Sequence, residues 1–199
     1  MAIKHTFARL AVAAVLSTAG AAAQADYVDV DLSGWQSFGA LFNPNNSSTF
    51  VSLGAGTAVT GFEYLGLTFT AQSPSWRSEF TLTVNYDPPN ENLAAFMDHS
   101  PSTLNSAGVF GPANGAWGSG GSFNDGAPFT VGPNGQVWVV VWETYDDGGP
   151  TGLDATVSAG TLRIHYTPAI PEPGSMALLA LGLGAVGVAV RRRRQTANL

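Results

Sequence analysis

Acidic side chains around one glycine-rich turn are the residues best suited to chemistry in this chain. Asp146 and Asp147 precede two glycines, Glu143 stands before them, and Asp154 follows the turn. Calcium takes several carboxylate and carbonyl oxygens from flexible loops, and such a turn can supply both. The spacing does not match an EF-hand loop, and a solvated Asp-Gly turn between two strands explains the same residues. A calcium site at Asp146, Asp147 and Asp154 and a plain turn therefore both remain open.

Few other residues point to catalysis. The chain has no cysteine, which excludes thiol catalysis, thiolate metal sites and disulfides. His99 and His165 are the only histidines after residue 25, and His165 is expected to be structural because it alternates with apolar neighbours. Metalloprotease, nucleophile-elbow and phosphate-loop motifs are absent, and the fingerprint-like residues 182–187 lack the βαβ context of a dinucleotide site. Thirteen scattered carboxylates leave glycoside hydrolysis only as a minor alternative.

Trp117 is the candidate contact for a ligand. It opens the glycine-rich run 117–121, within a stretch of weak strand character. Loops at one end of a β-sandwich often carry a binding site, and an exposed tryptophan there would suit a carbohydrate. The alternative is that the indole fills the core beneath its own loop.

The elements that would position these residues are β-strands. Residues 27–32 alternate with period two, so that Val28, Val30 and Leu32 face one way and the aspartates face the other. Residues 136–142 are apolar on both faces, as expected of a central strand. Further strands are predicted at 49–53, 64–71, 79–86 and 155–166, the last turning at Ala159-Gly160. We therefore predict one all-β domain over residues 26–166, a β-sandwich or jelly roll.

Residues 87–126 fit this pattern poorly. They contain many glycines and prolines and form an unusually long connection for a compact domain. A short helix is predicted at 91–98 and a short edge strand at 107–110, with the remainder as loops.

Charge separates this domain from the ends of the chain. Residues 26–170 contain thirteen acidic residues and two arginines, a net charge of −11, whereas the whole chain carries −6. So acidic a surface repels phosphate backbones and excludes nucleic acid as a partner. The same charge would keep the domain soluble.

The first 25 residues read as a secretory signal peptide. A positive start is followed by an apolar segment from Leu10 to Ala23 and by the small-x-small ending Ala23-Gln24-Ala25. Cleavage after Ala25 would begin the mature chain at Asp26.

The last thirty residues form an anchor. A linker, 167–175, contains Pro171, Glu172 and Pro173, and fifteen apolar or glycine residues follow at 176–190. A helix over these residues would be about 22 Å long, short of the roughly 30 Å hydrocarbon core. The side chains of Arg191, Arg192, Arg193 and Arg194 can reach the headgroups and keep the tail 191–199 in the cytoplasm. We predict a transmembrane helix, with a core helix as the alternative.

This tail resembles the PEP-CTERM sorting signal, on the basis of the Pro-Glu-Pro motif, the short hydrophobic helix and the arginine-rich end at 170–194. The resemblance implies an exosortase substrate from a Gram-negative bacterium that makes extracellular polysaccharide. It also implies that Pro171, Glu172 and Pro173 are the recognition element and that the helix is removed or exchanged after export. The domain itself is loosely similar to P-domain-like sandwiches over residues 65–84, around Trp76 and Arg77.

Three functions follow as expectations. The favoured one is a non-enzymatic surface or matrix protein, exported through the inner membrane, anchored there transiently, sorted by exosortase and associated with extracellular polysaccharide or biofilm. The alternative is a carbohydrate-binding module that uses Trp117, with or without calcium. A glycoside hydrolase with a dispersed carboxylate site is the third.

Overall fold

The computed structural model describes residues 25–85, 96–117, 127–149, 152–169 and 181–184. Residues 24–169 form one compact unit. In this unit the described strands are β1 (Asp26–Asp31), β2 (Gln36–Ser37), β3 (Ser48–Ser52), β4 (Ala58–Ala71), β5 (Phe80–Asn85), β6 (Phe96–His99), β7 (Gly108–Ala116), β8 (Phe129–Thr130), β9 (Gln136–Glu143) and β10 (Ala155–Thr167).

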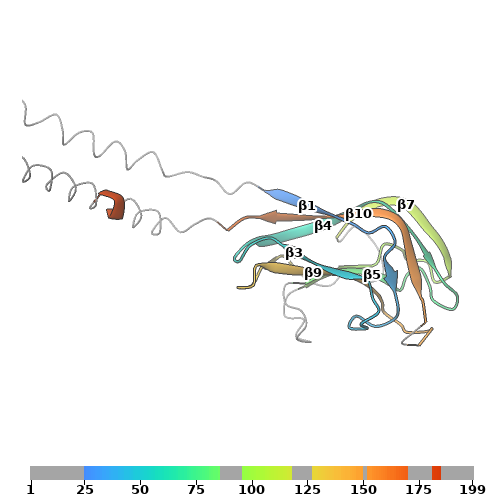
Figure 1. Cartoon of the computed structure of the whole chain (residues 1–199). Helices are drawn as coiled ribbons and strands as arrows, with labels where there is room; N and C mark the ends of the chain where they lie inside the picture. Colours follow the sequence, from blue (N-terminus) through green and yellow to red (C-terminus); the bar gives the residue numbers. More distant parts are fainter. Residues whose placement is uncertain (1–24, 86–95, 118–126, 150–151, 170–180, 185–199) are drawn as a thin grey trace, which may run out of the picture. The chain divides into compact units, whose positions relative to one another are not determined.

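These strands form two antiparallel sheets that lie face to face (Figure 1). Sheet A has the order β1-β10-β4-β7, with β2 paired to β10 and β8 paired to β4. Sheet B has the order β3-β9-β5-β6. The prediction of an all-β sandwich is confirmed for the described residues.

The core lies between the sheets and takes side chains from both. Phe69 on β4 stacks against Phe80 on β5, with ring centroids 4.1 Å apart. Tyr64 on β4 stacks against His99 on β6 at 5.9 Å. Because these pairs join the two sheets, burial of their rings holds the layers together. His99 therefore packs in the core.

Several strands match their predicted residues closely. β1 spans Asp26–Asp31, and its aspartates are exposed while Val28 and Val30 are half-buried. β9 lies between β3 and β5, which confirms the prediction of a central strand. β10 runs unbroken through Gly160, where the pairing register with β4 shifts. A Cβ at Gly160 would meet the Leu67 backbone at 2.9 Å, so the bulge at this position requires glycine.

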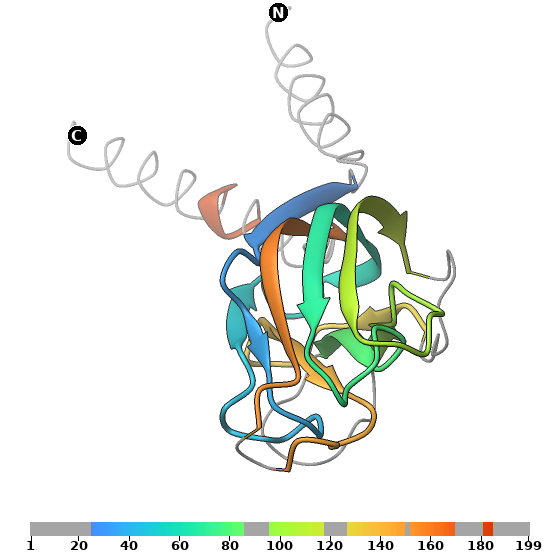
Figure 2. The ribbon, with the colours of Figure 1, turned by 90° about the vertical axis from the view of Figure 1, so that its right-hand side faces the viewer.

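The stretch between β5 and β8 was predicted less well. The helix predicted at 91–98 is wrong over Phe96–Asp98, which belong to β6, while residues 91–95 lie outside the described residues. Met97 is fully buried between the sheets, and this packing outweighs local helix preference. The predicted edge strand at 107–110 is confirmed, but as β7 it continues to Ala116 (Figure 2). Its glycines allow close approach, because a Cβ at Gly111 would overlap the Leu67 carbonyl.

Candidate functional site

A cluster of buried carboxyl groups lies at one end of the core. Glu143 is the last residue of β9 and has the same strand phase as Val137, Val139 and Val141, which face the core. It is 0% exposed, and its Oε1 accepts a hydrogen bond from Ser37 Oγ at 3.1 Å.

Asp154, just before β10, is 1% exposed and accepts a hydrogen bond from Ser75 Oγ at 2.9 Å. Its backbone N–H donates to the Ser37 carbonyl at 2.9 Å, so that Ser37 of β2 bonds to both Asp154 and Glu143. Glu79, also buried, accepts from the Trp76 N–H at 2.8 Å. We call Glu79, Glu143 and Asp154 the carboxyl cluster.

Burial controls the protonation of the carboxyl cluster. It raises the pKa of Glu143 to about 9, and the charges of Asp154, Glu79 and Asp147 act in the same direction. Burial also raises the pKa of Asp154 and of Glu79. Glu143 is therefore neutral at physiological pH, since ionising a desolvated carboxyl beside other carboxylates is unfavourable.

The carboxyl cluster does not have the arrangement of a hydrolytic site. In the described residues, Glu143 Oε2 and Asp154 Oδ2 are buried without a hydrogen-bond partner. A polysaccharide cannot reach groups that are 0% and 1% exposed, whereas glycoside hydrolysis needs two carboxyls flanking the scissile bond. The sequence carried one signal for the cluster: Glu143 continues the alternation of Val137, Val139 and Val141. No comparable signal marked Glu79.

The three aspartates of the predicted calcium site, Asp146, Asp147 and Asp154, lie in different surroundings. Asp146 and Asp147 are exposed in the turn after β9, whereas Asp154 is buried and bonded to Ser75. Across the described parts of the chain, no group of three or more acidic, histidine or cysteine side chains is placed to hold a metal ion. The charges of Asp146 and Asp147 do reach Asp154 and help to raise its pKa. Calcium binding at these residues stays a prediction.

Trp117 packs against the core. It directly follows β7, its N–H donates to the Phe62 carbonyl at 2.8 Å, and its ring contacts the buried cluster. Its indole Nε1 is buried and has no hydrogen-bond partner among the described residues. This placement matches the alternative in which Trp117 fills the core beneath its loop.

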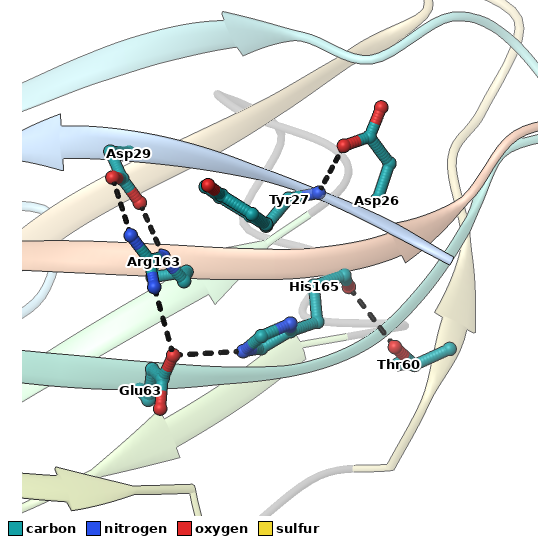
Figure 3. A network of polar contacts seen from close by, with 7 residues as sticks. All are labelled: Asp26, Tyr27, Asp29, Thr60, Glu63, Arg163 and His165. Carbon is teal, nitrogen blue, oxygen red and sulfur yellow. Dashed lines mark hydrogen bonds and ion pairs between the residues drawn. The ribbon is translucent and has the colours of Figure 1, made fainter. Parts of the chain in front are cut away.

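A polar network crosses the outer face of sheet A (Figure 3). Arg163 on β10 binds Asp29 on β1 through two hydrogen bonds, of 2.8 and 2.9 Å, and lies 3.7 Å from Glu63 on β4. Glu63 also contacts His165 Nε2 at 3.2 Å. The Arg163 guanidinium stacks 4.1 Å from the Tyr27 ring centroid.

This network links three adjacent strands, which fits the structural role expected of His165. The hydrogen bond from Arg163 lowers the pKa of Asp29, and the pKa of Arg163 is raised in turn. The sequence did not indicate the network, because it depends on the register of β1 and β4 against β10.

The tail carries the remaining predicted residues. Pro171, Glu172, Pro173 and Arg191–Arg194 lie outside the described residues, as does most of 176–190. Residues 181–184 are helical, and Leu181 and Leu183 are exposed. Among the described segments, none is a helix with the length and hydropathy of a membrane span. The signal peptide prediction, at 1–25, also falls almost wholly outside them.

Comparison with known proteins bears on the tail and scarcely on the domain. No curated protein matches the chain. The VP1 pentamer of Human Polyomavirus 6 aligns at 10% identity over 74% of this chain and 95% of that chain, with a TM-score of 0.20, too low to carry an argument. The family model of the PEP-CTERM protein-sorting motif matches residues 169–194. The chain therefore carries a PEP-CTERM protein-sorting motif.

Proposed function

We propose that this protein is a non-enzymatic component of the cell surface or extracellular matrix, made by a Gram-negative bacterium that secretes polysaccharide. The PEP-CTERM motif at 169–194 carries the proposal, because it implies export and processing by an exosortase. Pro171, Glu172 and Pro173 would be the recognition element for that enzyme. The segment 176–190, followed by Arg191–Arg194, would hold the chain in the inner membrane until processing.

The domain supports a binding or structural role better than a catalytic one. Its carboxyl cluster is buried, and Trp117 packs on the core, so neither offers an open reaction site. The first strand begins at Asp26, directly after the expected signal peptide. The exported part would thus be almost entirely folded sandwich.

Replacement of Glu172 by alanine tests the sorting role. Full-length protein carrying Glu172→Ala should remain in the inner membrane of an exosortase-containing host, while the wild type is processed and leaves it. The control is Asp147→Ala, which removes the same charge from an exposed turn of the domain and should be processed normally. Normal processing of Glu172→Ala, measured by mass spectrometry of the mature C-terminus, would contradict the proposal.

A further inference from the structure

The outer face of sheet B carries a group of aromatic rings. Alternation along β9 turns Val137, Val139 and Val141 into the core, so that the intervening side chains point outward. The pairing of β3 with β9 aligns the outward residues of both strands. The outward residues of the two strands are Ser48, Phe50, Ser52, Gln136, Trp138, Val140 and Trp142, of which Val140 is 0% exposed and is not open to a ligand.

Three of the rings gather at one point. Phe50 pairs directly with Trp138 across the two strands. Phe42, from the loop between β2 and β3, stacks on Trp138 with ring centroids 6.1 Å apart and planes within 5° of parallel. Phe42 is 44% and Phe50 is 52% exposed. Exposed aromatic side chains grouped in this way are typical of a binding surface.

The outward neighbours of these rings along β3 and β9 are mostly polar, and none of them is charged. Ser48 and Ser52 flank Phe50 along β3, and Gln136 precedes Trp138 on β9. Trp142 is fixed by its own hydrogen bond, from Nε1 to Thr83 Oγ1 at 2.8 Å. None of the seven outward residues on β3 and β9 carries a charge. The acidic residue Asp98 lies two strands away on β6 and is only 8% exposed, whereas the outer face of sheet A carries Asp29, Glu63 and Arg163.

This combination favours an uncharged, hydroxyl-rich ligand. Aromatic faces pack against the C–H faces of sugar rings, while hydroxyl and amide groups bond to sugar hydroxyls. A domain with a net charge of −11 repels anionic polymers, and it also repels a second copy of itself. A neutral polysaccharide meets neither obstacle.

We propose that the part of the outer face of sheet B formed by β3 and β9 binds an uncharged polysaccharide, with Phe42, Phe50 and Trp138 under the sugar rings. Ser48, Ser52 and Gln136 hydrogen-bond to the hydroxyls at the edges. This inference rests on the proposed function, since it names the surface through which the exported domain meets extracellular polysaccharide. It replaces Trp117 as the ligand contact.

Affinity electrophoresis of the full-length chain in detergent tests the surface. The gels contain hydroxyethylcellulose, galactomannan or dextran as neutral polymers, or alginate as an anionic one. We expect one or more neutral polymers to retard the chain and alginate not to do so. Phe50→Ala and Phe42→Ala should each weaken binding on the order of tenfold, because truncated aromatic anchors cost that much or more.

Two further variants separate loss of contact from loss of fold. Phe50→Tyr keeps the ring and should retain binding. Tyr145→Ala removes a ring that is 66% exposed but lies beyond β9, and it should bind as the wild type does.

Four results would overturn the inference: no retardation by any neutral polymer, retardation by alginate alone, unchanged binding of Phe50→Ala, or a dimer in sedimentation that Phe50→Ala dissociates. None of these four results depends on processing of the tail. A failure of polysaccharide binding can therefore be distinguished from a failure of the sorting experiment.

Discussion

Replacing Glu143 by glutamine should stabilise the domain at alkaline pH and change its stability little near pH 4.5. The raised pKa of Glu143, about 9, means that the folded domain keeps a proton which the unfolded chain releases near the ordinary value of 4.5. Between these two values folding takes up a proton, so the free energy of unfolding falls as the pH rises. The loss is about 1.4 kcal/mol per pH unit for one such group.

Summed over that window, the loss is several kcal/mol, a large part of the stability of an ordinary domain. Glutamine has the shape of the protonated carboxyl and can still bond to Ser37, but it cannot ionise. The free energy of unfolding of Glu143→Gln should therefore fall much less as the pH rises. Asp154 and Glu79, whose pKa values are also raised, will leave a weaker slope of the same sign.

Urea unfolding of residues 26–169, followed by tryptophan fluorescence from pH 5 to 9, measures this effect. The matched control is Glu63→Gln, in which a half-buried glutamate of the sheet A network is changed in the same way. Its midpoint should decline with pH in parallel with the wild type. If the wild-type midpoint does not fall between pH 5 and 9, or if Glu143→Gln falls equally, the reasoning is refuted.

Two further substitutions test the fold. Met97→Ala should cost about 2–5 kcal/mol, because Met97 is fully buried on β6; a cost below 1 kcal/mol in chemical unfolding would argue against its place in the core. Asp29→Asn should lower Tm by no more than about 5 °C, since the pair with Arg163 is exposed. Because the pKa of Asp29 is lowered by folding, this stabilisation is present at neutral pH and disappears as the pH falls below the ordinary aspartate value. An effect in calorimetry that is unchanged at 1 M salt would contradict the ion pair.

The sequence predicted those strands whose pattern is local. β1 alternates between valine and aspartate, and β9 is apolar on both faces, so the sequence of each strand predicts which of its faces are buried. The sequence of β7 does not predict a strand, because Gly111, Pro112 and Gly115 resemble turn residues. Their place in a strand depends on close contact with β4, which only the folded chain supplies. The same holds for β6, where burial of Met97 decides against a helix.

The candidate sites divide in the same way. The sorting motif is a linear pattern, and the family model found it where the sequence predicted it. The carboxyl cluster joins β9, the segment before β10 and the loop before β5, which are distant in the chain. The aromatic surface on sheet B likewise requires the register of Phe50 against Trp138. Neither of these arrangements can be predicted from the spacing of the residues along the chain.

The position of β10 has a mechanical consequence. It is the strand that leads into the tail, and it lies between β1 and β4, with hydrogen-bonded partners on both sides over most of its length. A pull on a tethered tail enters the domain at Thr167 and loads these hydrogen bonds together, in shear. The beginning of β1, at Asp26, is paired beside the same end of β10. If the protein is attached to the cell as proposed, fluid drag would load the domain through an interior strand and not through an edge strand.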